Sequence, residues 1–475
     1  MAAILLLLLA FAFAPGALAQ APPDRVPLAD WQPLPAAGER PPSAAAVAAR
    51  DRLLGPRWSD PRHVTLNWVG VSSFVVTMRG HLFLFDAWEI VGVHRDYLPI
   101  GREDLAALEP EAIFIGHGHF DHAADAGYVA GRSGAVVVAS EEQCSTVKAD
   151  ARREGNEGRF SCLITGTQSV PAAGSIDQVR VWEDVEPVSI LKHVHSAATE
   201  PSDENRPDPF LPVFDPAPYV ERLNGSPDEL ATFLGTLGDA EGGTRMYHFR
   251  DGAFTLLLGD SAGPIFDHPR VGEALDRLPG CVDVMANAIL GFDQPVSGLQ
   301  DPVLYVAAAH PKVFVPTHAD AWAPALSAGQ AAYHERLTRD LGRLESPPEL
   351  DHLLDPGDYL RERAYRVDDP RWEPPMPGSS CAPDPARLSL AVSPARARLG
   401  QATLFRFRVT ARLAGRRSPI AGAKVRLGRR RAITDADGRA TIPYRLTHRD
   451  ARRRPSAVKE GFLPGRARVR VLPAR

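Results

Sequence analysis

Apolar runs bounded by turn-forming residues recur along the chain from about residue 63, and they predict a series of β-strands. In the first half these runs read VTLNWVG, SFVVTMRGHLFLFD, EAIFIGH and AVVVAS. Between them, GREDLAALEP predicts a short helix and DAGYVAGRSG predicts a helix or a turn. Because strands alternate with helices, the pattern favours a layered α/β architecture.

The apolar runs continue through the second half of the chain. QVRVWEDVEPVSILKHVHS is patterned as β-structure, and TRMYHFRDGAFTLLLGD predicts a hairpin. The hairpin prediction rests on Asp251 and Gly252, since Asp-Gly is a favoured dipeptide for a tight turn between two strands. GCVDVMANAI and KVFVPTH predict strands, and DPVLYVAAAHP predicts a helix between them.

Residues 385–475 have a different pattern. Short runs of alternating polar and apolar residues read LSLAVSP, ATLFRFRVTARL, AKVRLG, RAITDADGRATIPYRL and RARVRVL, and turn residues separate them. Alternation of this kind without helical stretches predicts a small all-β sandwich.

Three stretches show neither the apolar pattern of a strand nor that of a helix. Residues 20–60 and 346–384 are rich in proline and are predicted to be linkers. Residues 199–226 carry a proline every few positions and are predicted to be a long loop, which in a compact domain is usually functional or disordered. These boundaries leave 61–345 as one α/β domain.

Residues 1–19 are expected to be a signal peptide. An apolar stretch from Ala2 to about Ala14 precedes a small-residue cleavage motif that ends at Ala19. The stretch is shorter than the roughly 20 apolar residues that a membrane span needs. We therefore expect an exported protein, periplasmic or secreted, and a retained N-terminal anchor is the less favoured alternative.

The four cysteines form no CxxC pair, so a cysteine zinc site is not indicated. Export permits disulfides, and Cys144 could bridge to Cys162 if their segments are neighbours. Buried free thiols are an equal alternative.

Charge divides the chain into two parts. Residues 381–475 hold 24 lysines and arginines against five aspartates and glutamates, whereas the whole chain has a net charge of −4. Opposite charges predict two physical modules. The basic module favours an anionic cell-envelope polymer as a partner, with a basic surface without function as an equal alternative. Nucleic acid is not an expected partner of an exported chain.

Candidate chemistry is concentrated in the sequence FIGHGHFDH. His117, His119, Asp121 and His122 follow directly after a predicted buried strand. Imidazoles and carboxylates are good ligands for zinc and similar ions. Alternate residues of a turn can point in two directions, so one short loop can serve two adjacent metals. A solvated histidine-rich turn is the less favoured interpretation.

Further ligands are expected at the ends of later apolar runs, because strand ends on one edge of a sheet converge. His195 ends VSILKHVH, Asp260 ends FTLLLGD and His318 ends KVFVPTH. His193 competes with His195 for the same role, and its position in the motif favours His195.

The order of these motifs, HGHFDH, then a histidine, GDS and PTH, resembles the metallo-β-lactamase superfamily over roughly residues 63–345. The resemblance implies an αββα sandwich that holds two divalent metal ions, with zinc expected. It assigns the seven ligands to two ions and a bridge, so that the first ion is held by His117, His119 and His195, the second by Asp121, His122 and His318, and both by Asp260.

A closer resemblance lies in LNWVGVSSFVVTMRGHLFLFDAW. It is similar to the branch that contains L-ascorbate-6-phosphate lactonase and N-acyl phosphatidylethanolamine phospholipase D, which typically reads W-x-G-H-S-S-F and then has a strand ending in Asp-Pro. Here Val71 replaces the histidine and Ala87 replaces the proline, which puts any role of that histidine in doubt. Asp86 remains, and the resemblance implies that it orients a metal-bound histidine, with a turn-capping aspartate as the alternative.

The resemblance implies a hydrolase in which a hydroxide that bridges two metals attacks the substrate. Asp121 and Asp260 are the expected catalytic residues, because they would hold this hydroxide together with the metals. A carboxylate bridge suits phosphodiesters and lactones, so a small-molecule or lipid-like substrate is expected. The alternatives are β-lactam hydrolysis and a non-catalytic envelope-binding protein.

The predicted loop at 199–226 follows His195 directly. It is expected to overhang the metals and to shape substrate access, with Phe210, Phe214 and Tyr219 as candidates for an apolar wall. A solvated insertion that does not contact the site is the alternative.

In the last part of the chain, PIAGAKVRLGRRRAITDADGRATIPYRL resembles bacterial immunoglobulin-like and carboxypeptidase-regulatory-like domains. Asp435, Asp437 and Gly438 look superficially like calcium ligands, but a turn with polar capping is the favoured interpretation. No catalytic set of residues is recognisable there.

Overall fold

The structure is a computed structural model of the chain. It describes residues 24–88, 98–155, 160–196, 239–291, 298–320, 329–372 and 388–473, the last range with gaps at 414–415, 448–453, 460–461 and 463. The predicted signal peptide and the predicted access loop at 199–226 lie outside the described residues. In the described part, no helix combines the length and the apolar character that crossing a membrane requires.

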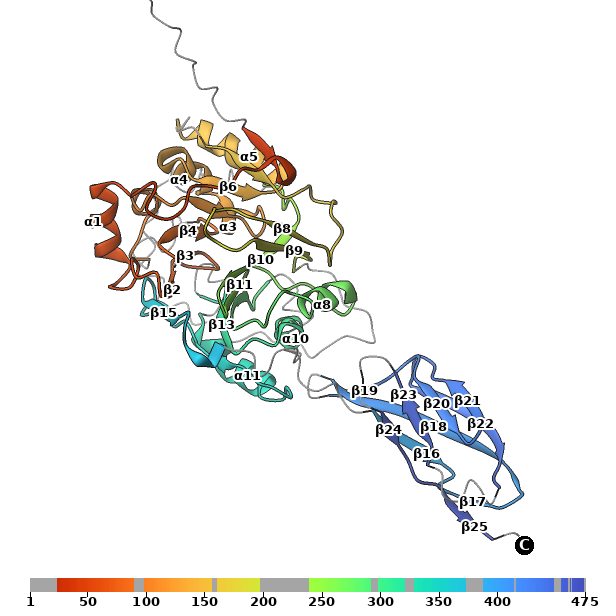
Figure 1. Ribbon diagram of the computed structural model, residues 1–475. Coiled ribbons are helices and arrows are strands. Elements are labelled where there is room, and N and C mark those ends of the chain that lie inside the picture. The colour runs from red at the N-terminus through yellow and green to blue at the C-terminus, as the bar shows by residue number, and fades with distance from the viewer. Residues whose placement is uncertain are drawn as a thin grey trace, which may run out of the picture.

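Two β-sheets form the centre of the larger domain (Figure 1). The first sheet has eight strands, in the spatial order β1 (Arg25–Pro27), β7 (Cys162–Ile164), β6 (Val136–Ala139), β5 (Ala112–Phe114), β4 (His81–Phe85), β3 (Phe74–Met78), β2 (His63–Trp68) and β15 (Glu362–Arg366). The second has seven strands, in the order β14 (Glu349–Leu350), β13 (Val313–Thr317), β12 (Val284–Ala288), β11 (Phe254–Gly259), β10 (Thr244–Asp251), β9 (Val188–His193) and β8 (Ile176–Val179).

Aromatic side chains join the inner faces of the two sheets. Phe83 of the first sheet stacks on Phe249 of the second, with ring centroids 4.8 Å apart, and Phe114 meets Phe249 at 5.0 Å. The Tyr247 hydroxyl donates a hydrogen bond across the interface to the Ile115 carbonyl, 2.8 Å away. Buried aromatic pairs of this kind contribute apolar area and fix the orientation of the two sheets.

Helices cover the two outer faces. α2 (Arg102–Ala107), α4 (Ala126–Ser133) and α5 (Glu141–Arg153) form the layer on the first sheet, and α1 (Ala44–Leu53) packs against α2. α8 (Pro269–Leu275), α10 (Gln300–Ala309) and α11 (Ala331–Leu341) bury their apolar faces against the second sheet. The short helices are η1 (Leu28–Asp30), α3 (Phe120–Ala123) and η3 (Pro370–Trp372). The predicted α/β class and its αββα layers are confirmed for this domain.

Local chemistry explains two of these elements. α5 begins with a capping box, in which the Ser140 hydroxyl accepts a hydrogen bond from the Gln143 backbone amide and Gln143 Oε1 accepts one from the Ser140 backbone amide. β10 and β11 form the predicted hairpin, and Gly252 has a φ of 61° at its turn. A positive φ favours glycine there because glycine has no Cβ.

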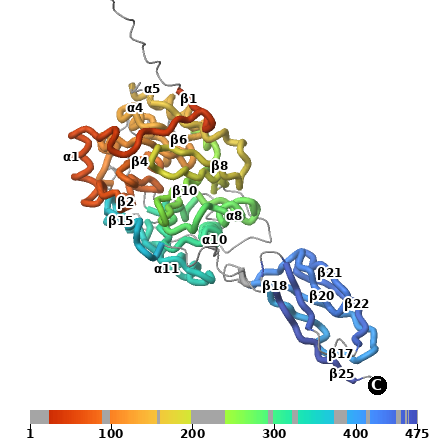
Figure 2. Tube along the Cα trace, in the orientation of Figure 1, coloured from red at the N-terminus to blue at the C-terminus, as the bar shows by residue number. Residues whose placement is uncertain are grey.

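The two proline-rich stretches, which the sequence predicts to be linkers, contain strands and a helix. Residues 25–27 pair with β7, and residues 44–53 form α1. In the later stretch, β14 extends the second sheet and β15 pairs antiparallel with β2, so residues 346–372 complete the domain. β1 and β14 are too short to show alternation in the sequence, and Pro27 is itself part of β1. Figure 2 shows β15 beside β2 although they are far apart in the sequence.

Residues 388–473 contain only strands among their described residues. They are β16 (Ser389–Ser393), β17 (Arg396–Arg398), β18 (Ala402–Leu413), β19 (Arg416–Pro419), β20 (Lys424–Leu427), β21 (Arg430–Ile433), β22 (Arg439–Arg445), β23 (Ser456–Val458), β24 (Gly465–Arg466) and β25 (Arg470–Leu472). Two four-stranded sheets enclose an apolar core that includes Phe405, Phe407, Val409 and Val425. This arrangement agrees with a β-sandwich, and its assignment to an immunoglobulin-like class stays a prediction.

Two smaller alternatives from the sequence are resolved. Cys144 of α5 and Cys162 of β7 form a disulfide rather than two free thiols. At Asp435, the backbone carbonyl accepts a hydrogen bond from the Gly438 amide, and the carboxylate accepts one from the Arg439 amide. This is the capped turn that the sequence favours over a calcium loop.

Candidate metal centre

All seven predicted ligands lie at one edge of the two sheets, just beyond the carboxyl ends of strands. His117 and His119 lie in the loop after β5, and Asp121 and His122 lie in α3, which follows it. His195, Asp260 and His318 follow β9, β11 and β13. β9 and β10 are antiparallel, as are β10 and β11, so β9 and β11 run in the same direction. β11, β12 and β13 are parallel. Their ends therefore meet at the same edge.

One group of side chains consists of His117, His119 and His195. Their ligand atoms lie within 4.8 Å of one another. The rings of His117 and His195 have centroids 4.5 Å apart, and those of His119 and His195 are 4.7 Å apart. This is the set that the sequence assigns to the first ion.

A second group consists of Asp121, His122 and His318. His122 Nε2 lies 3.1 Å from His318 Nε2, and Asp121 Oδ2 lies 3.2 Å from His318 Nε2 and 3.4 Å from His122 Nε2. This is the set that the sequence assigns to the second ion. All three side chains are buried.

Asp260 lies between the two groups. Its Oδ2 is 2.7 Å from His117 Nδ1 in the first group and 3.5 Å from His122 Nδ1 in the second. Its Oδ1 is buried and has no hydrogen-bond partner among the described residues. The structure thus brings the seven predicted residues together, with Asp260 Oδ2 near one histidine of each group.

Two glycines allow this close packing. A Cβ on Gly116 would lie 2.1 Å from Asp260 Oδ2, and a Cβ on Gly118 would lie 2.2 Å from the Ala240 carbonyl oxygen. Such distances are shorter than any real Cβ contact. The glycines on either side of His117 are therefore required for Asp260 and for the segment at 239–243 to approach the loop.

Behind the second group, Asp86 orients His122. Asp86 Oδ2 is 2.9 Å from His122 Nδ1, and it accepts a hydrogen bond from the Ser72 hydroxyl at 2.8 Å. Asp86 Oδ1 accepts one from the Gly116 amide at 2.9 Å. A hydrogen bond at Nδ1 fixes the ring and leaves Nε2 to face His318, as expected of an aspartate that orients a ligand histidine.

His193 points away from the first group, to which His195 belongs. Its Nδ1 lies 3.2 Å from the Tyr305 hydroxyl of α10, on the outer side of the second sheet. His195 instead lies against His117 and His119. Residues two apart on a strand lie on the same face, but β9 ends at His193, so His195 lies past the strand and can turn to the other side. The geometry favours His195, as the motif position does.

Burial sets the protonation of several site residues. It lowers the pKa of His119, and it lowers the pKa of His195 to about 2, with neighbouring histidines adding to both effects. Burial alone would raise the pKa of Asp121, but His122 and His318 hold it well below its usual range. Burial alone would lower the pKa of His122, but Asp121 and Asp260 raise it well above its usual value. Metal ions bind neutral imidazoles and ionised carboxylates, so His122 releases its proton when it binds an ion.

Divalent cations fit the donors that are present. Each group offers three nitrogen or oxygen atoms at close range, in the mixture that zinc and similar ions prefer. A buried carboxylate oxygen without a partner, as at Asp260, costs free energy unless a cation or a donor satisfies it. The number and identity of the ions stay predictions.

Val71, Asp320 and Tyr359 support the loop that carries His318, a role that no sequence motif predicts. The Val71 carbonyl accepts a hydrogen bond from the His318 amide at 3.0 Å, and its own amide donates to Asp320 Oδ2 at 3.1 Å. The Tyr359 hydroxyl donates to the same oxygen at 2.6 Å. No local pattern marks these residues, because they meet only in the folded domain. Val71 thus positions the loop through its backbone.

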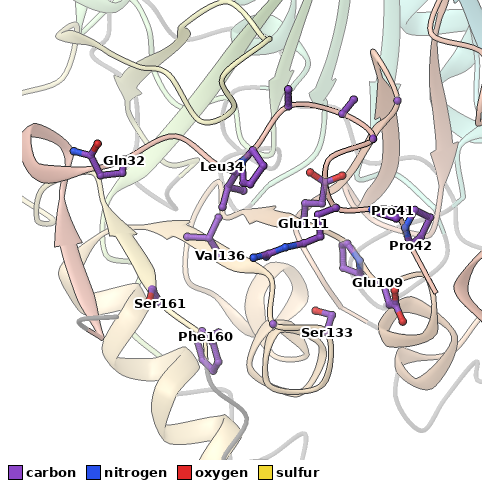
Figure 3. Close-up of a pocket in the computed structure, with 18 of the residues that line it drawn as sticks. Gln32, Leu34, Pro41, Pro42, Glu109, Glu111, Ser133, Val136, Phe160 and Ser161 are labelled. Carbon is purple, nitrogen blue, oxygen red and sulfur yellow. The ribbon is translucent and has the colours of Figure 1, made fainter. Parts of the chain in front are cut away.

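A cavity of about 510 Å³ lies at the opposite edge of the first sheet, beside the amino ends of β5, β6 and β7 (Figure 3). Its walls include Leu34, Pro41, Pro42, Glu109, Val136 and Phe160. None of the seven predicted ligands lines it. The cavity is therefore separate from the candidate metal centre.

A family model described as the metallo-beta-lactamase superfamily matches residues 66–318, slightly more than half of the chain. The chain belongs to the metallo-β-lactamase superfamily. The match extends through the HGHFDH loop and ends at His318, so it spans all seven predicted ligands of this superfamily member. It agrees with the sequence prediction of a metal-dependent hydrolase.

Curated relatives match a shorter part of this superfamily member. The chain is 32% identical to a UPF0173 metal-dependent hydrolase of Pyrobaculum neutrophilum over 77 residues, which is 16% of this chain and 32% of the relative. A protein of the same description from Pyrobaculum calidifontis is 34% identical over the same length, with the same coverage of both chains. The chain thus spans about a third of the length of the curated relatives that it matches.

Solved structures of low identity are also similar to part of this superfamily member. Igni18, a metallo hydrolase from Ignicoccus hospitalis, is 15% identical, with 64% of this chain and 98% of that chain covered and a TM-score of 0.40. CmlA, a diiron beta-hydroxylase from Streptomyces venezuelae, is 13% identical, with 64% and 54% covered and a TM-score of 0.36. Zn(2+)-bound PqqB from Methylobacterium extorquens is 12% identical, with 62% and 98% covered and a TM-score of 0.35. At these values the similarity carries no argument about the reaction.

Proposed function

We propose that this member of the metallo-β-lactamase superfamily is an exported hydrolase that uses two divalent metal ions. The observation that carries the proposal is the position of Asp260 between two groups of donors, 2.7 Å from His117 and 3.5 Å from His122. When bound, two ions would supply Lewis acidity and lower the pKa of a shared water. Zinc is the expected metal, since histidine and carboxylate donors suit it.

The protein's own residues have distinct tasks in this proposal. His117, His119 and His195 would hold the first ion, and Asp121, His122 and His318 would hold the second. Asp121 and Asp260 would accept hydrogen bonds from the attacking water and so orient it. The Asp86 carboxylate keeps His122 in one orientation through its Nδ1. Burial of the site excludes bulk water and strengthens these interactions.

A phosphodiester or a lactone is the proposed substrate class, as a small-molecule or lipid-like compound. Both carry an electrophilic centre and an oxygen that two cations can polarise, and a carboxylate bridge holds two cations firmly. Export is supported by the apolar N-terminal stretch with its cleavage motif and by the disulfide between Cys144 and Cys162.

Metal analysis combined with a substrate screen tests the proposal. The purified protein is expected to contain about two metal ions per chain, and to hydrolyse bis(p-nitrophenyl) phosphate or a lactone in preference to a chromogenic β-lactam. A phospholipid in the same screen tests the lipid-like class. The variant His119→Ala should lower the rate by more than about a hundredfold, beyond the loss typical of residues that only support a ligand.

His310→Asn is a matched control for that variant. His310 ends α10 away from the metal centre and has a φ of 50°, which asparagine tolerates. The control is expected to retain metal and activity. If His119→Ala keeps full activity, or if the wild-type protein takes up no metal, a non-catalytic binding protein becomes the better description.

A further inference from the structure

The outer face of one sheet of the C-terminal sandwich carries a group of arginines. Phe405, Phe407 and Val409 of β18 point into the core, so Arg406 and Arg408 point outward. Strand register adds residues of the two neighbouring strands to this surface. We define the arginine face as Ala391, Ser393, Arg406, Arg408, Arg439 and Thr441, and Asp435 is the one acidic residue beside them. These side chains line an open groove of about 510 Å³.

Like charges lie directly opposite each other on this face. Arg408 of β18 is in register with Arg439 of β22, and Arg406 is the next outward residue along β18. Such a pair destabilises a sheet, because the side chains of opposed residues lie close together. Arg439 has a carboxylate partner in Asp437, 2.6 Å away. Arg406 and Arg408 form no ion pair or hydrogen bond with any other described side chain.

The neighbours of Arg406 supply hydroxyl groups. Ser393 lies opposite Arg406 on β16, and Thr441 lies opposite it on β22. All three side chains are exposed. A planar carboxylate is satisfied by one guanidinium fork, whereas a phosphate has further oxygens that can accept from hydroxyls on either side. The row Ser393–Arg406–Thr441 therefore matches a phosphate group better than a carboxylate.

We propose that the arginine face binds a linear polymer with a phosphate in each repeat unit. Arg406 and Arg408 lie two residues apart on a strand, which separates them by about 7 Å. One phosphate cannot span that distance and contact both guanidinium groups fully, but adjacent phosphates of a polymer can. The charge of the module is complementary to such a ligand, with 24 basic and five acidic residues in 381–475. The anionic ligand also relieves the repulsion between Arg408 and Arg439.

A membrane surface fits the arginine face less well. Proteins that lie on membranes insert large apolar side chains between lipid headgroups. The two central rows of this face carry alanine, serine and threonine between the arginines. The exposed apolar residue of β18, Leu404, lies outside these rows and opposite Pro443. We therefore assign the face to a soluble polymer.

Binding of the full-length mature chain to long-chain inorganic polyphosphate tests this proposal. The double variant R406T/R408T is expected to lower the affinity at least tenfold at moderate salt. It should also reduce the slope of log affinity against log salt by roughly two, since two phosphate contacts are lost. Threonine suits an exposed strand position, so the variant keeps the sheet.

The matched control is R426T/R431T, on the other sheet of the sandwich. Arg426 and Arg431 are also directly opposite and exposed, so this variant removes the same charge from a different surface. It is expected to change the affinity less than twofold. An equal loss in both double variants would mean that net charge alone drives binding, and would overturn the assignment to the arginine face.

Three further measurements complete the experiment. R406K/R408K keeps the charge without the fork, and it should bind polyphosphate with intermediate affinity even if the threonine variant proves unstable. Tighter binding of the wild-type chain to alginate, to phosphatidylglycerol vesicles or to duplex DNA than to polyphosphate overturns the proposed ligand. The rate of hydrolysis of small substrates should be equal in all these variants. A failure of the polyphosphate-binding proposal is therefore distinct from a failure of the proposed hydrolase.

Discussion

At the scale of single residues, the candidate metal centre depends on glycines, which have no side chain, as well as on the donor residues. Gly116 and Gly118 flank His117, and each allows another part of the chain to approach more closely than a Cβ permits. Val71 contributes through its backbone rather than its side chain. Donor residues alone would not converge without these close approaches.

Gly118→Ala tests this requirement. The added Cβ would lie 2.2 Å from the Ala240 carbonyl oxygen, so His117 and His119 must shift with their loop. A displacement of about 1 Å at a catalytic site can lower activity by roughly a hundredfold, and we expect a loss of that order together with weaker metal binding. Activity and metal content measured side by side would check it.

Gly272→Ala is the control for that substitution. Gly272 lies inside α8, its nearest neighbouring atom would be 3.6 Å from an added Cβ, and its φ is not positive. Alanine there should raise the free energy of unfolding by about 0.5–1 kcal/mol without changing activity. Equal losses of activity in both variants would show that the metal centre does not depend on the close approach at Gly118.

At the scale of elements, a buried histidine connects the first sheet to the segment between β8 and β9 of the second sheet. His81 of β4 lies 2.8 Å from Glu111 through Nδ1 and 2.8 Å from Asp184 through Nε2. The Trp182 indole also donates to Glu111, and the Ala37 amide donates to Asp184. Burial by itself would lower the pKa of His81, but the two carboxylates outweigh it and raise the pKa above its usual value. The imidazolium therefore joins β4, the loop before β5 and the segment before β9.

This contact predicts a pH dependence of stability. Because the pKa of His81 is higher in the folded state, its contribution is complete below the unfolded value of about 6.5 and is lost as the pH rises through the folded value. His81→Gln should lower the free energy of unfolding at pH 5.5 by about 1–3 kcal/mol and by less at high pH. Chemical denaturation at both pH values would measure the difference.

The exposed residue His268 supplies the control for this measurement. His268→Gln is expected to leave the difference in stability between the two pH values as it is in the wild-type protein. If His81→Gln destabilises the protein equally at both pH values, the histidine acts through packing and not through its charge.

At the scale of the whole molecule, the larger domain closes through a segment that the sequence predicts to be a linker. β14 and β15 add a strand to each sheet, and Trp372 is buried against Phe254, with ring centroids 5.3 Å apart. Tyr365 stacks on Phe254 from β15 at 5.9 Å. The domain therefore extends at least to residue 372.

Two truncated chains distinguish this boundary from the one that the sequence predicts. A chain that ends at residue 372 should fold and bind metal, since it keeps both edge strands and the Trp372 side chain. A chain that ends at residue 345 should lose more than about 3–5 kcal/mol, the cost typical of removing one buried tryptophan. Equal thermal stability of the two chains would show that residues 346–372 act as a linker, as the sequence predicts.

The sequence determined the class of the larger domain and the identity of its seven candidate ligands. Apolar runs with strand periodicity report burial directly, and donors at the end of such runs must reach one edge of a sheet. Both features are local in the chain, so the printed residues contain them. The β-sandwich of 388–473 was predictable for the same reason.

Only the tertiary structure decided the distances within and between the two groups of donors, and that Asp320 and Tyr359 support His318. It also decided that residues 346–372 belong to the larger domain and that Arg408 faces Arg439. These facts depend on strand register and on contacts between residues far apart in the chain. Periodicity gives the face of a strand on which a residue lies, whereas the partner across the next strand is set by packing of the whole domain.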